Sequence, residues 1–298
     1  MILCFGSINL DLIFPLPVLP QRGQTVLGRA MRVEPGGKGA NQAAAAARDG
    51  ARVLFAGAVG ADVFADQALV HLREAGVELS RVVAADISTG CAAICVDSDG
   101  NNQIAVASGA NLLARADQVE DALLVRGTTL LVQGETDLGE TATMIRRARA
   151  GGARVVLNLA PAAPLAEDAL REVDYLVINE DEGEAVGRRF GAEGSAAGLF
   201  AALGVATIVT RGEQGLEAAT KEGVLQMPAH KVTVVDTTAA GDCFTGVLAA
   251  GLDRGLALRE ALHRANVAAA LCCGKAGSQG SLPLAADTDV ALRGQGRA

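Results

Sequence analysis

The chain has 298 residues, of which 50% are hydrophobic and only 3% aromatic, so it can bury a large core built from Ala, Val, Leu and Ile. Its formal net charge of −8 argues against a broad nucleic-acid surface, which needs clustered Lys and Arg. No apolar run reaches the roughly 18 to 20 residues that cross a membrane, and the first residues lack the basic start of a signal peptide. We therefore expect a cytoplasmic protein with no nucleic-acid and no membrane partner.

Strand-like and helix-like segments alternate along most of the chain. The apolar spacing predicts strands at 2–8, 52–59, 129–132, 154–157, 175–178 and 207–209, and helices at 41–49, 62–75 and 242–252. The short apolar runs are typical of strands that are buried on both faces of a parallel sheet. The alternation predicts a single α/β domain over residues 1–298, with a doubly wound, mostly parallel sheet and helices on both faces.

Two segments interrupt this alternation and have the pattern of strands in a separate sheet. They are residues 25–33 and 90–107, the second with a turn at 97–101. We expect the regions of about 12–36 and 88–108 to form a small β-sheet lid beside the α/β domain. Such a sheet leaves open edges and an apolar face, for which dimerisation is a common solution, so we expect a homodimer through the lid.

Residues 235–246, VDTTAAGDCFTG, lead through small side chains into the helix predicted at 242–252. Free N–H groups at a helix start, together with the positive end of the helix dipole, attract a phosphate without any Lys or Arg. Asp242 lies beside these groups, where it can take a proton from an attacking hydroxyl. Because Asp also serves as a simple helix cap, this segment alone leaves both interpretations open.

Two further polar segments lie in the first part of the chain. Asn9 and Asp11 share one face of a strand, and an amide beside a carboxylate can bind vicinal hydroxyls, although both residue types also end strands. Residues 36–42, GGKGANQ, open a helix and bring Lys38 and Asn41 toward a small ligand. This segment is no P-loop, because the GxxxxGK[ST] spacing is absent, and a plain turn is the alternative.

Two more polar segments follow strands, at the sheet edge where α/β proteins bind ligands. Residues 179–182, Asn-Glu-Asp-Glu, offer carboxylates to Mg²⁺ or, alternatively, an acidic first helical turn that complements the dipole. Residues 210–215, TRGEQG, form a turn that could border a nucleotide phosphate.

Together these segments resemble the ribokinase-like family of sugar and nucleoside kinases over nearly the whole chain. The resemblance rests on GSINLD at 6–11, GGKGANQ at 36–42, NLAPA at 158–162, NEDE at 179–182 and DTTAAGD at 236–242, the last being highly specific to the family. It implies transfer of a phosphoryl group from ATP to O5 of D-ribose. A nucleoside, fructose or a keto-sugar acid is the alternative substrate within the family.

Two other classes of protein fit less well. A non-catalytic sugar-binding regulator on the same fold would be expected to have lost Asp242 or its glycine-rich approach. An NAD-dependent oxidoreductase would need GxGxxG after the first strand, which the chain lacks.

The resemblance also implies roles for single residues. Asp242 would be the catalytic base, and the N–H groups of Ala239, Ala240, Gly241 and Asp242 would form an anion hole. The sugar would contact Asn9, Asp11, Gly37, Lys38, Asn41, Glu135 and Asp242. The nucleotide would lie along Asn179, Thr210, Gly212, Gly215 and Asn266. Glu182 would hold Mg²⁺ through water and phosphate, and K⁺ or another monovalent cation would bind at Asp236, Thr238, Lys275, Gly277 and Ser281, several of them through carbonyl oxygens.

Four residues depart from the common pattern of the family: Gly134, Arg211, Thr245 and Gly280. None of them is at the expected base or anion hole. They leave open the choice of sugar and the tightness of the cation loop.

Overall fold

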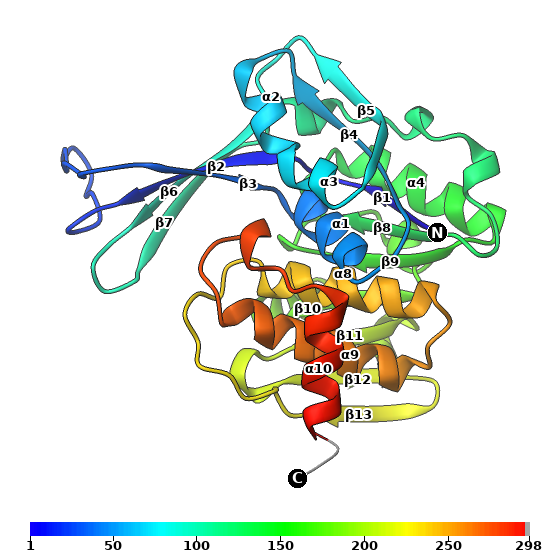
Figure 1. The fold of residues 1–298 in the computed structure, drawn as a ribbon. Coiled ribbons are helices and arrows are strands. Elements are labelled where there is room, and N and C mark those ends of the chain that lie inside the picture. Colours follow the sequence, from blue (N-terminus) through cyan, green and yellow to red (C-terminus); the bar gives the residue numbers. More distant parts are fainter. Residues whose placement is uncertain (296–298) are drawn as a thin grey trace.

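The computed structural model describes residues 1–295, and these form two β-sheets and the helices around them (Figure 1). The strands of the larger sheet are β1 (Ile2–Phe5), β4 (Val53–Gly60), β5 (Glu78–Ala85), β8 (Thr129–Gln133), β9 (Arg154–Asn158), β10 (Tyr175–Asn179), β11 (Ala206–Thr210), β12 (Leu216–Thr220) and β13 (Gly223–Met227). They lie in the order β13-β12-β11-β10-β9-β8-β1-β4-β5. All neighbours are parallel except β11 with β12 and β12 with β13, so the predicted mostly parallel sheet is confirmed.

The helices are α1 (Lys38–Arg48), α2 (Val63–Ala68), α3 (Val70–Glu74), α4 (Leu138–Gly151), α5 (Glu167–Leu170), α6 (Glu180–Phe190), α7 (Ala196–Leu203), α8 (Ala240–Asp253), α9 (Leu258–Cys273) and α10 (Ala285–Gln295). Successive side chains of a strand point to opposite faces of the sheet. Ile2 and Cys4 of β1 therefore pack in one core with α1, α8 and α9, whereas Leu3 and Phe5 pack in a second core with α4 to α7. Both faces are covered, as the doubly wound pattern predicts.

The smaller sheet contains β2 (Asn9–Pro15), β3 (Arg32–Gly36), β6 (Gly90–Val96) and β7 (Asn102–Ala107), in the order β3-β2-β6-β7. It projects away from the body of the molecule on the left of Figure 1. The strands β2 and β6 are parallel, and the other two pairs are antiparallel. Segments that are far apart in sequence thus form a separate sheet, as predicted.

Two predicted strands have different bounds in the structure. The strand predicted at 2–8 ends at Phe5, and Asn9 begins β2 in the other sheet. The chain bends between them against α1, where a Cβ on Gly39 would come within 2.5 Å of the Ser7 nitrogen. The strand predicted at 25–33 begins only at Arg32, which pairs with Ile13, the last residue of β2 that is paired with β3.

Two helices also differ from the prediction. The helix predicted at 41–49 begins three residues earlier, at Lys38. The helix predicted at 62–75 is divided at Leu69 into α2 and α3, with the side chain of Asp62 accepting hydrogen bonds from the first turn of α2.

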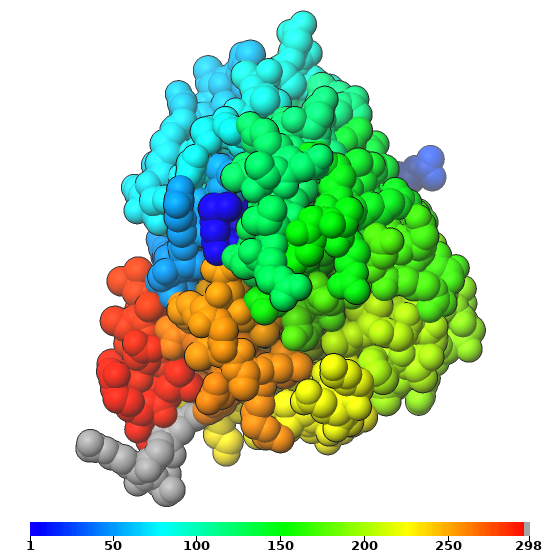
Figure 2. Space-filling model, turned by 90° about the vertical axis from the view of Figure 1, so that its right-hand side faces the viewer, coloured from blue at the N-terminus to red at the C-terminus, as the bar shows by residue number. Residues whose placement is uncertain are grey.

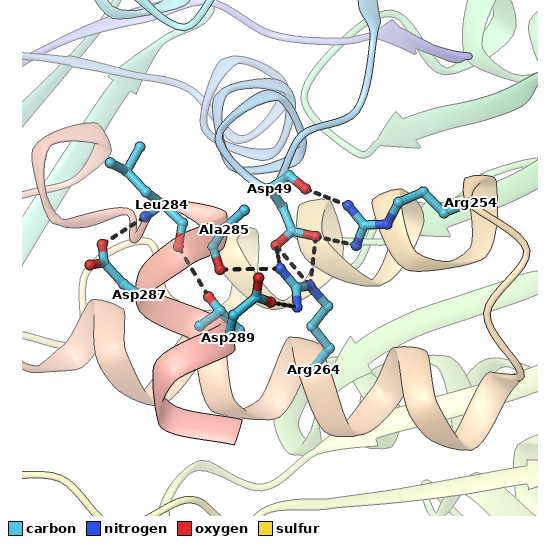
Figure 3. Close-up of polar contacts among 8 residues, drawn as sticks. Asp49, Arg254, Arg264, Leu284, Ala285, Asp287 and Asp289 are labelled. Atoms are coloured by element: carbon cyan, nitrogen blue, oxygen red, sulfur yellow. Dashed lines mark hydrogen bonds and ion pairs between the residues drawn. The ribbon is translucent and has the colours of Figure 1, made fainter. Parts of the chain in front are cut away.

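A buried carboxylate, Asp49, joins the three helices α1, α8 and α9 (Figure 3). Its side chain is 2% exposed and accepts hydrogen bonds from Arg254 at 2.6 Å and from Arg264 at 2.6 Å. Arg264 also reaches Asp289 of α10 at 2.5 Å. Because α1 and α8 carry the residues of the candidate site, this cluster fixes the elements on which that site is built.

The first residues of the chain form a small patch between later segments on the face shown in Figure 2. The amino group of Met1 donates to Asp253 at 2.9 Å and to the carbonyl of Gly127 at 3.2 Å. Within residues 1–295, no helix is long and apolar enough to span a membrane.

Candidate active site

The start of α8 is formed by an unusual turn at Ala239. This residue has φ 59°, and it is the one non-glycine residue with a positive φ in the described part of the chain. The left-handed conformation costs an alanine roughly 1 kcal/mol, and such strain is commonly found at functional sites. The turn leads into Ala240, whose N–H donates to the Thr237 carbonyl, and Ala239 offers no side-chain cap. The N–H groups of the next residues, Gly241 and Asp242, have no acceptor within a helix and are suited to an anion.

A cavity of about 230 Å³ lies in front of this helix start. It is at the carboxyl ends of β9, β10 and β11, the edge at which open α/β sheets bind ligands. The predicted site residues that line it are Lys38, Asn179, Glu182, Thr210, Ala239, Ala240, Gly241 and Asp242. Residues predicted from four separate segments are thus brought to one place.

Asp242 is held by two neighbouring residues of α1. The Asn41 amide nitrogen donates to Asp242 Oδ2 at 2.9 Å, and the Gln42 amide nitrogen donates to Oδ1 at 2.9 Å. Asp242 as a whole is 6% exposed. Asn41 Oδ1 is buried and lacks a hydrogen-bond partner among the described residues, so it can accept a bond from a ligand hydroxyl.

A second cavity, of about 210 Å³, includes Asn9, Asn111 and Glu135 in its lining. Asn9 Oδ1 accepts a hydrogen bond from Asn111 at 2.7 Å. Glu135 accepts from the Ser7 hydroxyl at 2.6 Å and from the Lys38 backbone nitrogen at 3.0 Å. Polar groups on β2 and after β8 therefore face a space that can accommodate hydroxyl groups.

Gly37 precedes α1 with φ 89°, and a Cβ there would come within 2.7 Å of the Asn9 nitrogen. Only glycine allows the start of α1 to approach β2 this closely. This approach places Lys38 and Asn41 beside Asn9.

The carboxyl groups around Asp11 lie close enough together to favour the binding of one proton, at Asp11. Burial raises the pKa of Asp11 to about 7, with further contributions from Glu135, Glu34 and Asp242. The pKa of Lys38 is raised chiefly by the negative charge of Asp242, which outweighs the effect of burial. Lys38 is therefore the local cation that balances the acidic cluster.

Asn179 and Glu182 form a capping box at the start of α6, with reciprocal bonds of 2.8 and 2.9 Å between side chains and backbone nitrogens. Burial raises the pKa of Glu182, which lines the larger cavity. Among residues 1–295 no group of three or more His, Cys, Asp or Glu side chains could hold a metal ion. Glu182 and Asp242 are the two carboxylates that line this cavity, and so small a number fits Mg²⁺ that is held mainly by waters and substrate phosphates.

The turn at 210–215 is only partly in the cavity. Thr210 lines it, whereas Gly212 and Gly215 do not, and Asn266 of α9 lies elsewhere, donating to the Pro228 carbonyl at 2.7 Å. Arg211 forms an ion pair of 2.5 Å with the buried Glu217 of β12. That pair gives Arg211 a structural partner within the sheet.

Most residues of the expected cation loop lie together behind the start of α8. Asp236 accepts hydrogen bonds from the backbone nitrogens of Thr238 at 2.9 Å and Gly277 at 3.0 Å. Burial alone would raise the pKa of Asp236, but these bonds hold it below its ordinary value. The Cys272 thiol lies 3.0 Å from the Ser281 hydroxyl and 3.8 Å from the Thr238 carbonyl. The backbone nitrogen of Lys275 donates to the Cys272 carbonyl. These contacts bring Asp236, Thr238, Gly277 and Ser281 together around one carboxylate.

Four site residues were not given roles from the sequence: Gln42, Asn111, Gln133 and Asn158. Gln133 and Asn158 could have been noticed, because each is a polar residue that ends an apolar strand at the ligand-binding edge. Asn111 follows no periodic pattern, and its bonds to Ile8 and Asn9 span about a hundred residues. No local signal could have identified it.

Comparison with known proteins agrees with this geometry. The family model described as pfkB family carbohydrate kinase matches residues 1–285. The chain is 34% identical over 291 residues to a ribokinase from Haemophilus influenzae, covering 95% of each chain. A ribokinase structure from Thermotoga maritima superposes with a TM-score of 0.91 at 32% identity, covering 98% of this chain and 99% of that one.

A second solved structure is an Arabidopsis thaliana ribokinase complexed with ribose and ATP. It has a TM-score of 0.88 at 29% identity and covers 98% of both chains. With a family model that spans most of its length and relatives of full length, the chain belongs to the pfkB family of carbohydrate kinases.

Proposed function

We propose that the protein phosphorylates O5 of D-ribose, using ATP and releasing ADP. The observation that carries this proposal is that Lys38 joins two cavities: one in which Asp242 lies at an open helix N-terminus, and one lined by Asn9 and Glu135, where Glu135 accepts a hydrogen bond from the Lys38 backbone nitrogen. One side offers N–H groups to a phosphate, and the other offers hydrogen bonds to hydroxyls. Relatives of nearly equal length are ribokinases, and one of them has been solved with ribose and ATP.

On the sugar side, we assign Asp242 as the base that takes the proton of the attacking hydroxyl. Asn41, with its unpartnered oxygen, and Asn9, Asp11, Gly37, Lys38 and Glu135 would hold the remaining hydroxyls. Base assistance contributes about 10²- to 10⁴-fold in typical enzymes, so orientation of the sugar must supply much of the rest. The small sheet would act as a lid that limits transfer to water.

On the nucleotide side, the N–H groups of Ala239, Gly241 and Asp242 would form the anion hole for the γ-phosphate, whereas that of Ala240 is bonded to the Thr237 carbonyl. Asn179 and Thr210 would border the nucleotide in the larger cavity, and Gly212, Gly215 and Asn266 would lie further along it. Glu182 would hold Mg²⁺ through water and phosphate, and Asp236, Thr238, Lys275, Gly277 and Ser281 would hold K⁺. These cations would neutralise phosphate charge and stiffen the loop behind the anion hole.

We further propose that the chain forms one kinase domain, acts in the cytoplasm and dimerises through the small sheet. Exposed apolar side chains on that sheet support the dimer: Val33, Ile104 and Val106 are each at least 40% exposed. A partner subunit would cover them and the open edge of β7.

The test is release of ADP, measured with a panel of pentoses, hexoses and nucleosides, with and without K⁺. We expect the highest kcat/KM with D-ribose and a marked increase on adding K⁺. A preference for a nucleoside or a hexose would refute ribose as the substrate, and no ADP release with any acceptor would refute the kinase assignment.

A single substitution tests the base. Asp242→Asn should lose roughly 10²- to 10⁴-fold or more in turnover, because the amide cannot accept the proton. Calorimetric binding of ribose and ATP should be retained. Near-normal turnover would contradict the assignment of Asp242 as the base.

A further inference from the structure

Gln42 is a fully buried amide whose hydrogen bonds are nearly all used within the protein. Its nitrogen donates to Asp242 Oδ1 at 2.9 Å and to Asn158 Oδ1 at 2.8 Å, and its oxygen accepts from the Gln133 nitrogen at 2.9 Å. A carboxylate can only accept, so the amide group facing Asp242 must be the NH₂ end. Turning the Gln42 amide over would place its oxygen against two acceptor oxygens. The orientation of this side chain is therefore fixed by its partners.

Those partners are themselves anchored to the central sheet. Asn158 ends β9, and its nitrogen donates to the Val177 carbonyl of β10 at 2.9 Å, so its oxygen must face Gln42. Gln133 ends β8 and is 1% exposed. A buried chain of amides thus runs from three adjacent strands, through Gln42, to the carboxylate on α8.

Asn41 and Gln42 hold opposite oxygens of the same carboxylate, but in different settings. Asn41 has a buried oxygen without a partner, which suits it to a ligand. Gln42 is 0% exposed and its oxygen is already bonded to Gln133, although neither Asn41 nor Gln42 lines either of the two cavities. A ligand hydroxyl that bonds to the free oxygen of Asn41 would therefore leave the bond of Gln42 to Asp242 Oδ1 intact.

We propose that Gln42 is a positioning residue, which selects the side-chain conformation of Asp242 in which Oδ2 faces the attacking hydroxyl. This inference rests on the proposed role of Asp242 as the base. Positioning of this kind matters because a displacement of about 1 Å at a reacting group can cost on the order of 10²-fold in rate. Gln42 itself touches neither sugar nor nucleotide, so its effect should appear in kcat.

The test is Gln42→Leu, which removes the donor at similar volume. We expect kcat to fall about 10- to 100-fold, while KM for the best sugar and for ATP changes by no more than about twofold. Gln42→Met, with an unbranched side chain of nearly the same length, serves if the leucine variant does not fold. Combining either substitution with Asp242→Asn should lower the residual rate no further.

Gln118→Leu is the matched control, because Gln118 also donates twice, to the carbonyls of Gly57 and Arg81 at 2.9 and 2.8 Å, away from the site. It should lower the melting temperature without a selective loss in kcat. A kcat of Gln42→Leu that equals that of Gln118→Leu, or a KM that rises in step with the loss of kcat, would overturn the proposal.

A crystal structure of Gln42→Met separates this inference from the proposed function, since it needs no activity. We expect the Asp242 side chain in a second rotamer or in two conformers. An unmoved Asp242 would refute the positioning role even if the wild-type protein is an active ribose kinase. Conversely, a displaced Asp242 in a protein without kinase activity would support the positioning role of Gln42 and refute only the proposed kinase function.

Discussion

Replacing Asp49 by Asn should destabilise the protein without changing its chemistry. Asp49 follows α1 and is the buried partner of Arg254 and Arg264 (Figure 3). The substitution keeps the shape of the side chain but removes its charge. Two guanidinium groups then remain beside a neutral amide that can satisfy only part of their hydrogen bonds.

The loss of folding stability depends on how well each arginine can replace the hydrogen bonds that it loses. Breaking a buried ion pair by removing one partner costs about 3–5 kcal/mol. Arg254 is 35% exposed and can be rehydrated, and Arg264, 11% exposed, keeps its bond to Asp289. We therefore expect the lower end, about 3 kcal/mol. For a chain of this length the unfolding entropy is about 0.6 kcal/mol per degree, so Tm should fall by about 5 °C.

The assay is thermal unfolding followed by circular dichroism at a fixed scan rate, with Asp66→Asn as the control. Asp66 pairs with Arg73 at 2.9 Å, but its side chain is 88% exposed, so this pair should contribute little, and Tm should change by about 1 °C or less. Equal shifts in both variants would refute the reasoning that burial makes the Asp49 cluster important.

The Asp49→Asn variant should retain its activity at 25 °C. Asp49 lies at the end of α1 opposite to Lys38, about 16 Å along the helix at 1.5 Å per residue. The bonds of Asn41 and Gln42 to Asp242 form at the other end. A large loss of kcat at 25 °C would show that the cluster sets the position of α1 and not only its stability.

Two further substitutions test the site. Gly241→Ala should leave Tm unchanged or slightly higher, because an added Cβ meets no atom within 4 Å. The methyl group beside the anion hole should nevertheless lower kcat/KM for ATP at least tenfold. An unchanged kcat/KM for ATP would contradict the anion hole. Asp11→Asn should raise the KM for ribose far more than that for ATP, and equal changes in both would count against a sugar contact. Asp11→Asn should also have a higher Tm than the wild type at pH 8 in the absence of ligands. Burial raises the pKa of Asp11 to about 7 from an ordinary 3.8, so the folded wild type carries an unfavourable charge above pH 7. That gain should shrink as the pH falls from 8 toward 4, where the wild-type carboxyl becomes protonated, and a gain independent of pH would contradict the shift.

The central sheet was predictable because its strands are buried on both faces. The three inner residues of Thr129–Gln133 and of Arg154–Asn158 are all apolar, and this local pattern is enough to identify both strands. The edge strand Glu78–Ala85 was not predicted, because Glu78, Ser80 and Arg81 interrupt its apolar residues. The buried strand β12 was not predicted either, because Glu217 interrupts its apolar residues, so an unbroken apolar run decided which strands the sequence revealed.

The division between the two sheets could not be predicted locally. Ile2 and Asn9 are only seven residues apart, yet Ile2 pairs with Val53 and Asn9 with Gly36 and Gly90. A strand pattern shows that a segment is extended, but its partner depends on contacts with distant parts of the chain. For this reason the sequence predicted one long strand where the structure has two.

The candidate site shows the same limit in its chemistry. Asp242 and Asn179 both lie at helix starts, and the sequence allowed a capping role for Asp242 and an acidic first helical turn for residues 179–182. In the structure Asn179 does cap its helix, through Glu182, while also lining the cavity. The two roles are thus compatible, and finding a cap does not argue against a ligand.

Asp242 behaves differently, because both of its carboxylate oxygens accept hydrogen bonds from α1, about 200 residues away in sequence. A residue that only capped α8 would turn its oxygens to the N–H groups of its own helix. Those N–H groups instead remain without a side-chain cap, at a turn that Ala239 forms in a strained conformation. The protein thus keeps both the helix start and the carboxylate available to reactants, and the amides of Asn41 and Gln42 are what hold the carboxylate away from its own helix.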